Sequence, residues 1–217
     1  KASTACQHAT GELCLHHAKE KLIMKPVRQV VSRSKGRVHG LYYSRKVKRL
    51  LPWESQLERD ALIILDLIPE VDDIAVQPFK LNYQFDGRER VYFPDILITG
   101  DFGRTVIEVK PKRDLGKPEN LKRFPVIETV LAEKGYQFEI WTEDDIRREP
   151  RSSNVRSLSP HRLSASPEFD ASRFRSYSES AGSFLIQDVV EIMGEEATLD
   201  DALTLVATGQ LKLNLDE

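Results

Sequence analysis

The sequence lacks the features that mark several large classes of protein. Only 2 of its 217 residues are cysteine, so a disulfide framework is excluded and a reducing, intracellular setting is expected. No run approaches the roughly 18 consecutive apolar residues that a membrane-spanning helix needs, and no apolar signal-peptide core follows the first residues. No internal repeat is visible. Hydrophobic residues make up 40% and charged residues 30%, which predicts a globular protein with no role in a membrane.

Charge is distributed unevenly along the chain, although the formal net charge is only −2. Residues 1–50 carry twelve lysines and arginines against two glutamates, whereas residues 179–217 carry nine acidic residues against one lysine. Eleven of the basic residues lie between Lys19 and Arg49. We therefore expect residues 1–50 to be a basic N-terminal arm that contacts the phosphates of double-stranded DNA. The alternative is a solvated arm with no fixed role.

Composition divides the rest of the chain into three segments. Residues 51–150 have the apolar periodicity of a compact α/β domain. Residues 151–180 contain ten serines and are expected to be a linker or a loosely folded bridge. Residues 181–217 regain apolar periodicity, in the order helix, turn, helix and short strand over Leu211 to Leu215, which outlines a small winged-helix-like domain. Its acidic charge favours contact with a protein over the reading of DNA. A small helical cap on the central domain is the alternative.

Local signals in the central segment predict a mixed sheet with helices on its faces. The expected elements are a helix from about Pro52 to Leu67, an extended segment over Val76 to Phe85 ending in the turn Asp86-Gly87, strands over Val91 to Ile98 and Thr105 to Val109, a helix between Pro118 and Lys134, and a strand over Tyr136 to Trp141.

Three charged residues fall on two neighbouring strands of this sheet. Thirteen positions separate Asp95 from Glu108, which is enough for a hairpin that places the two strand ends side by side. Because side chains alternate across a strand, Glu108 and Lys110 share one face, while Ile107 and Val109 point to the other. Two carboxylates and an ammonium on a face that should be apolar, or should pair its charges, indicate a functional site.

Divalent-metal chemistry accounts for this combination, since Mg²⁺ is typically held by one or two carboxylates and substrate phosphates. A metal between Asp95 and Glu108, with the backbone carbonyl of Val109 as a further ligand, would polarise a phosphodiester. Lys110 would orient a water or neutralise developing charge. Glu58, on the preceding helix, would complete the site or position a second metal. The alternative is that Glu108 and Lys110 form a surface ion pair of little consequence and that Glu58 is solvated.

Short motifs around these residues give a family resemblance. In chain order they are Ser55-Gln56-Leu57-Glu58, Gln77-Pro78, Tyr92-Phe93-Pro94-Asp95 and Ile107-Glu108-Val109-Lys110-Pro111, followed by the tail Leu203 to Leu211. Over about residues 50–150 the chain resembles the TnsA endonuclease subunit of heteromeric, cut-and-paste DNA transposases. That family belongs to the PD-(D/E)xK superfamily, so the resemblance implies a restriction-endonuclease-like α/β fold.

The resemblance also implies roles for individual residues. Glu58, Asp95 and Lys110 match the family's helix glutamate, strand aspartate and catalytic lysine. Glu108 stands where some members carry glutamine, and its carboxylate should favour metal binding. Gln77 matches a Gln-Pro dipeptide for which we expect a structural or DNA-proximal role. Glu54, one turn before Glu58, is an alternative ligand, although an acidic residue there also suits the start of a helix.

The implied function is Mg²⁺-dependent cleavage of the 5′ ends of a transposon, with Mn²⁺ as a substitute metal. An integrase-type partner transposase would cut and join the 3′ ends, and an AAA+ ATPase regulator is the other expected partner, so the protein would be bacterial, cytoplasmic and nucleoid-associated. Two alternatives remain: a stand-alone restriction or repair nuclease of the same superfamily, and a non-catalytic DNA-binding assembly module.

One further cluster lies outside the resemblance. Cys6, His8, Cys14, His16 and His17 fall within twelve residues and carry zinc-ligand chemistry, but their spacing matches no zinc motif that we recognise. The alternative is a disordered terminus.

Overall fold

The computed structural model describes residues 38–170, 172, 174 and 185–216. The Cys/His cluster at residues 6–17 and most of the expected basic arm lie outside these residues. No helix among the described residues is both long and apolar enough to cross a membrane.

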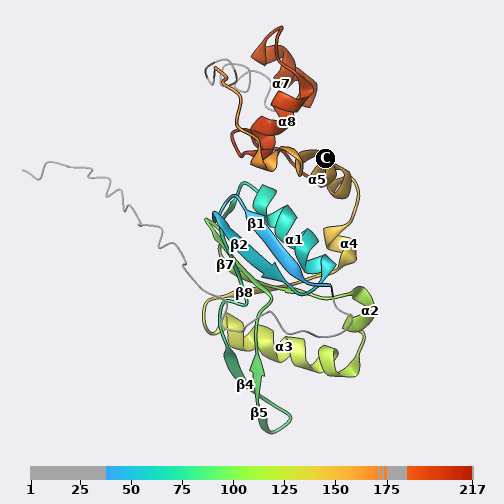
Figure 1. Cartoon of the computed structure of the whole chain (residues 1–217). Coiled ribbons are helices and arrows are strands. Elements are labelled where there is room, and N and C mark those ends of the chain that lie inside the picture. The colour runs from blue at the N-terminus through green and yellow to red at the C-terminus, as the bar shows by residue number, and fades with distance from the viewer. Residues whose placement is uncertain (1–37, 171, 173, 175–184, 217) are drawn as a thin grey trace, which may run out of the picture.

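A four-stranded mixed sheet forms the centre of the protein (Figure 1). Its strands, in spatial order, are β3 (Val71–Val76), β6 (Ile96–Gly100), β7 (Gly103–Val109) and β8 (Gln137–Trp141). Strand β6 is antiparallel to both β3 and β7, whereas β7 and β8 are parallel. The mixed sheet expected from the sequence is therefore confirmed.

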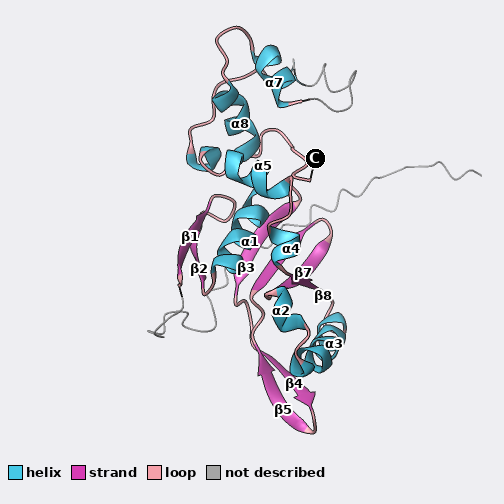
Figure 2. Cartoon of the chain, turned by 90° about the vertical axis from the view of Figure 1, so that its right-hand side faces the viewer, coloured by secondary structure: helices cyan, strands magenta, loops and turns pink. Residues whose placement is uncertain are grey.

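Helices cover both faces of the sheet and create two apolar cores. Helix α1 (Gln56–Leu67) packs over one face, where Ile107 and Val109 join its buried leucines and isoleucines. Helix α3 (Pro118–Ala132) packs over the other face, where Val106 meets Phe124 and Ile127. Figures 1 and 2 show the two helices on opposite sides of the strands. The alternation along β7 thus divides its side chains between the two cores.

Two hairpins flank the central sheet. The hairpin β4–β5 (Leu81–Phe85 and Arg88–Tyr92) turns at Asp86-Gly87, as expected, and extends beside α3 (Figures 1 and 2). The hairpin β1–β2 (Gly40–Ser44 and Arg49–Trp53) was not expected. It pairs Pro52 with Leu41, so the helix predicted from about Pro52 begins only at Gln56. Cross-strand pairing overrides the helix-start signal of the proline.

The carboxylate of Asp66, near the end of α1, fixes this first hairpin. It accepts hydrogen bonds from the hydroxyl of Tyr42 at 2.9 Å and from the backbone amides of Arg45 and Lys46, each at 3.1 Å. Three basic side chains of the hairpin also bond within the protein. Lys46 donates to the carbonyl of Ile68 at 2.9 Å, and other bonds join Arg45 to the carbonyl of Arg162 and Arg49 to that of Ile74. This end of the expected basic arm is therefore part of the folded domain.

Prolines interrupt two segments that the sequence analysis treated as continuous. The extended segment over Val76 to Phe85 is split by Gln77-Pro78 into the end of β3 and strand β4. The strand over Val91 to Ile98 is split by Phe93-Pro94-Asp95 into β5 and β6. The other expected strands and the helix after Pro118 are present.

Short helices follow the sheet: α2 (Lys112–Leu115) lies between β7 and α3, and α4 (Glu143–Ile146) comes after β8. The serine-rich segment begins with α5 (Arg151–Leu158) and the 3-10 helix η1 (His161–Leu163). Leu158 is buried in the α1 core.

The C-terminal region contains α7 (Ile186–Met193) and α8 (Leu199–Ala207). The strand expected over Leu211 to Leu215 does not form among the described residues, so a winged helix is not observed. Leu215 is instead buried in the α1 core, with Leu211 and Leu213 packed against it. The alternating leucines are satisfied by this contact rather than by a sheet.

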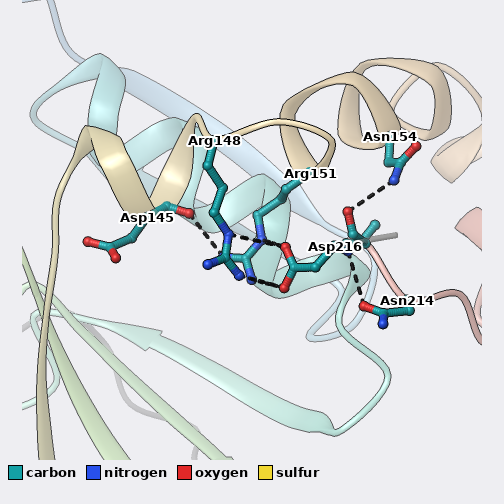
Figure 3. A network of polar contacts seen from close by, with 7 residues as sticks. Asp145, Arg148, Arg151, Asn154, Asn214 and Asp216 are labelled. Carbon is teal, nitrogen blue, oxygen red and sulfur yellow. Dashed lines mark hydrogen bonds and ion pairs between the residues drawn. The ribbon is translucent and has the colours of Figure 1, made fainter.

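Polar contacts hold the end of this tail against α5 (Figure 3). Asp216 accepts two hydrogen bonds from Arg151, at 2.7 and 2.6 Å, and two from Arg148, at 3.2 and 2.6 Å. The side-chain amide of Asn154 donates to the carbonyl of Leu215 at 3.0 Å. The tail thereby connects the C-terminal helices to the central domain.

Candidate active site

The sheet brings Asp95 and Glu108 together at one of its ends. Ile96 pairs with Ile107 across β6 and β7, so Asp95, directly before β6, lies opposite Glu108. The amide of Val109 donates to Oδ2 of Asp95 at 2.9 Å. On the opposite side, the amide of Gln77 donates to the carbonyl of Asp95 at 3.0 Å. The backbone of two neighbouring strands therefore holds Asp95 in place.

Glu108 lies at the centre of a short polar network. Its Oε1 pairs with Nζ of Lys110 at 2.8 Å, and its Oε2 accepts a hydrogen bond from the hydroxyl of Tyr92 at 2.8 Å. The side chain of Glu108 is only 4% exposed, against 27% for Lys110. A buried carboxylate of this kind is not part of a solvated surface ion pair, so that alternative fails for Glu108.

Tyr92 is the partner that sequence reasoning missed. It lies three residues before Asp95 in the motif Tyr92-Phe93-Pro94-Asp95, but the motif gives no direction for its hydroxyl. The contact with Glu108 exists because hairpin β4–β5 packs Tyr92 into the core under α3. This contact therefore depends on tertiary packing, which the sequence motif does not reveal.

Gln77 occupies a strained position beside the site. Its φ is 45°, in the left-handed region that non-glycine residues seldom adopt, and the residue is only 5% exposed. Its Oε1 is buried without a hydrogen-bond partner among the described residues. The structural or DNA-proximal role expected for Gln77 stays a prediction, and its backbone amide bonds to Asp95.

Glu58 lies in the first turn of α1 and bonds to residues of its own helix start. Its Oε1 accepts from the hydroxyl of Ser55 at 3.0 Å, and its Oε2 accepts from the amide of Glu54 at 2.9 Å. Ser55 in turn caps the helix by accepting from the amide of Glu58 at 3.1 Å. Burial raises the pKa of Glu58, although these bonds act against the rise. Glu54 thus supports Glu58 through its backbone.

The carboxylates of Asp95, Glu108 and Glu58 lie close enough to act on one another electrostatically. Burial raises the pKa of Asp95 well above its usual range, and the charges of Glu108 and Glu58 raise it further. Lys110 and the amide of Val109 act in the opposite direction without offsetting the rise. Burial, followed by the charges of Glu108 and Asp95, likewise raises the pKa of Tyr92. Ionisable groups with pKa values perturbed in this way are typical of functional sites.

Lys110 stays an ammonium in this environment. Burial lowers its pKa, but the charge of Glu108 and the hydrogen bond to it outweigh burial, so the net shift is upward. Lys110 is therefore suited to neutralise charge or to orient a water, and unsuited to accept a proton.

The donor chemistry fits a hard divalent cation that shares its ligands with a substrate. No three acidic, histidine or cysteine side chains in the described part of the chain converge into a metal cage. Mg²⁺ does not require one, since one or two carboxylates and a phosphate suffice. Asp95 and Glu108 provide the carboxylates. Burial, followed by the charges of Glu108 and Glu58, raises the pKa of Asp95, and a bound cation would act against that rise. Glu58 acts on Asp95 electrostatically, while its own oxygens accept bonds from Ser55 and Glu54, just before α1.

The fold and the site together define a class of protein. A mixed α/β sheet flanked by helices, with an aspartate, a glutamate and a lysine at one end of two adjacent strands, is consistent with a nuclease-like fold. Residues 68–143 match the family described as TnsA-like endonuclease N terminal. This match confirms, over residues 68–143, the resemblance to TnsA-like endonucleases that the sequence motifs carry. The matched residues include Asp95, Glu108 and Lys110, and α1 with Glu58 precedes them. No curated protein matches the chain.

Proposed function

We propose that this protein is the Mg²⁺-dependent endonuclease subunit that cleaves the 5′ ends of a transposon. The observation that carries the proposal is the group formed by buried Glu108 and half-buried Asp95 and Lys110, which lies inside the TnsA-like region and has more carboxylates than cations. A divalent cation would supply positive charge, and it would in turn attract the scissile phosphate.

Each residue of the site has a role in this proposal. Asp95 and Glu108 would hold the Mg²⁺, with the carbonyl of Val109 as a further ligand, and the bound metal would supply a Lewis acid and a water of lowered pKa. Lys110 would neutralise charge that develops on the phosphate oxygens. Glu58 would add negative potential beside Asp95, and Tyr92 would fix the carboxylate of Glu108.

We propose partners on chemical grounds as well. Cutting only the 5′ ends leaves the 3′ ends to a second enzyme, which we take to be an integrase-type transposase. The C-terminal helices carry acidic residues, among them Asp188, Glu191 and Asp200, and this charge disfavours contact with DNA. An AAA+ ATPase regulator is the partner that we propose for them.

A reconstituted excision assay tests this function. The full chain is combined with transposon-end DNA, the partner transposase and the ATPase of the same element, and cuts on each strand are mapped by end-labelling. We expect Asp95→Asn to lose the 5′ cuts and keep the 3′ cuts. Asp86→Asn is the matched control, because Asp86 lies in the exposed β4–β5 turn at a φ of 50°, which asparagine tolerates.

Two outcomes would change the proposal. If Asp95→Asn cut the 5′ ends as wild type does, Asp95 would have no catalytic role and a non-catalytic assembly module would be the better description. If the wild-type chain cut duplex DNA equally well without any partner, a stand-alone nuclease would replace the transposase subunit.

A further inference from the structure

Arg123, on α3, lies beside the active site with its charge unpaired. Among the described residues, no carboxylate forms an ion pair with its guanidinium and no acceptor bonds to it, and its Nε is buried without a partner. Elsewhere in the domain, Arg49, Arg59, Arg147, Arg148 and Arg151 all pair with aspartates. Because unpaired donors of a partly buried arginine are unfavourable, the arrangement calls for a ligand.

The position of Arg123 is fixed by packing. Its guanidinium lies 5.0 Å from the ring centroid of Phe124, a cation–π distance. Phe124 is buried in the same apolar core as Tyr83 and Tyr92. The packed Nε side therefore holds the group in place, while the side chain as a whole is partly exposed, so its terminal nitrogens remain available to a ligand.

Arg123 lies on the face of the sheet that carries the site. Glu108 and Val106 point to the α3 side of β7, and Tyr92 on that side donates to Glu108. Burial and the charges of Glu108 and Asp95 raise the pKa of Tyr92, and Arg123 is the positive group that acts against this rise. The guanidinium of Arg123 lies on Phe124, which packs in the same core as Tyr92, so Arg123 is near the network without belonging to it.

Arg90, an exposed arginine, provides positive charge farther from the site. Arg90 on β5 pairs across the hairpin with Tyr83 on β4, and hairpin and α3 lie side by side (Figure 2). Burial raises the pKa of Tyr83, and both Arg123 and Arg90 act against that rise. Glu119, one turn before Arg123 on α3, is the acidic group that acts on the same tyrosine, and within the described part of the chain no ion pair joins it to either arginine.

We propose that Arg123 binds a backbone phosphate of the DNA next to the scissile one, and that Arg90 continues this phosphate track along hairpin β4–β5. This inference rests on the proposed nuclease function. A planar guanidinium with paired donors matches the geometry of phosphate oxygens, and a phosphate contact carries no sequence information. The track would set the path of the DNA past Lys110 without choosing the site.

Arg104 provides a matched control for this proposal. It lies at the start of β7, whereas Glu108 lies near its end, and its guanidinium is 5.2 Å from the ring centroid of Tyr136. It is therefore a second arginine held on an aromatic ring, at the opposite end of the same strand. Loss of Arg104 removes the same charge and the same type of packing away from the site.

The experiment measures duplex binding by fluorescence anisotropy over a series of salt concentrations. The full chain carries Asp95→Asn to prevent cleavage, and is compared with the same chain bearing Arg123→Ala, Arg123→Lys or Arg104→Ala. We expect Arg123→Ala to weaken binding by about tenfold, equally for transposon-end and unrelated duplexes, and to reduce the slope of log K against log salt by about 0.9. Arg123→Lys should keep the slope, because it keeps the charge, and Arg104→Ala should match the parent.

The inference and the function that supports it can fail separately. A slope for Arg123→Ala equal to that for Arg104→Ala, or a parent chain that binds no duplex, would overturn the phosphate track. In the excision assay, a loss of 5′ cuts in Asp95→Asn alongside full activity of Arg123→Ala would leave the nuclease standing and remove only the track.

Discussion

Two clusters of charged residues in this protein treat an aspartate in opposite ways. At the C-terminal tail, Asp216 accepts hydrogen bonds from two arginines, and these bonds, led by those from Arg151, hold its pKa below the usual range (Figure 3). At the sheet end, burial and two neighbouring carboxylates raise the pKa of Asp95 well above that range. At Asp216 two guanidinium groups face one carboxylate. Around Asp95, two further carboxylates and one ammonium act on the carboxyl group.

The two aspartates therefore differ in role: Asp216 attaches the tail, whereas Asp95 belongs to the candidate active site. Pairing at Asp216 joins the tail to α5 and leaves nothing for a ligand to complete. The site around Asp95 is held by backbone bonds and by Tyr92, yet keeps an excess of carboxylates that a bound cation would balance. Natural proteins accept such imbalance where function requires it.

The largest effect is expected from removing a carboxylate at the sheet end. Asp95→Asn and Glu108→Gln should each lower the rate of 5′ cleavage by about 10³-fold or more, as when one member of a catalytic group is lost. Circular dichroism and DNA binding should remain those of the wild type. A cleavage rate within tenfold of wild type in both variants would mean that the imbalance has no catalytic purpose.

Removing the hydroxyl that holds Glu108 should have a smaller effect on cleavage. Tyr92→Phe keeps the ring in the core but loses the 2.8 Å bond to Glu108, and we expect a loss of about 10- to 100-fold in cleavage rate, the range for groups that orient a ligand. The metal concentration for half-maximal activity should rise as well, which a merely structural role would not cause. Tyr83→Phe is the control, since the hydroxyl of Tyr83 makes no hydrogen bond among the residues that the structure describes. Equal effects of the two substitutions would contradict an orienting role for Tyr92.

The two aspartates should also give pH dependences of opposite sign in metal-free buffer. A raised pKa in the folded state means that folded Asp95 binds its proton more readily than the unfolded chain. Ionised Asp95 therefore lowers stability, and this penalty disappears as pH falls through the raised pKa toward the usual value near 4. A folded-state pKa that lies one pH unit above the unfolded-state pKa corresponds to a penalty of about 1.4 kcal/mol. Denaturant titrations over pH 4 to 8 should show the wild type gaining stability relative to Asp95→Asn as the pH falls. A difference in free energy of unfolding that stays constant with pH would show that the pKa of Asp95 is not raised.

The smallest effect is expected at the tail. Asp216→Asn should lower the free energy of unfolding by about 0.5–1 kcal/mol at neutral pH, because the pairs are partly exposed. Its pKa is lowered, so this contribution is present above the usual aspartate value and is lost as pH falls through the lowered one. The 5′ cleavage rate should stay at the wild-type level. A drop in cleavage that persists at a temperature where the variant is fully folded would mean that the tail contributes to the site.

Much of the site could be predicted because it depends on local rules. The alternation of side chains along a strand placed Glu108 with Lys110, and the short connection between β6 and β7 placed Asp95 opposite them. The family motifs added Glu58 and Gln77, whose surroundings only the fold reveals. The bonds of Glu58 to Ser55 and Glu54 depend on where α1 begins, and pairing of Pro52 with Leu41 sets that start.

The features that sequence reasoning missed depend on distant contacts. Tyr92 bonds to Glu108 because a separate hairpin folds under α3. The alternating leucines after Leu211 have the pattern of a strand, but the α1 core accepts them without one. Arg123 belongs to no sequence motif. Its lack of an ion pair among the described residues is seen only when it is compared with the paired arginines of the same domain.

Anomalous diffraction from crystals of the full chain with transposon-end DNA and Mn²⁺ tests the central claim most directly. The account predicts a metal peak between the carboxylates of Asp95 and Glu108, next to a phosphate, and its loss in Asp95→Asn. A bound duplex with no metal peak at this position, or with the metal held by other residues, would contradict it.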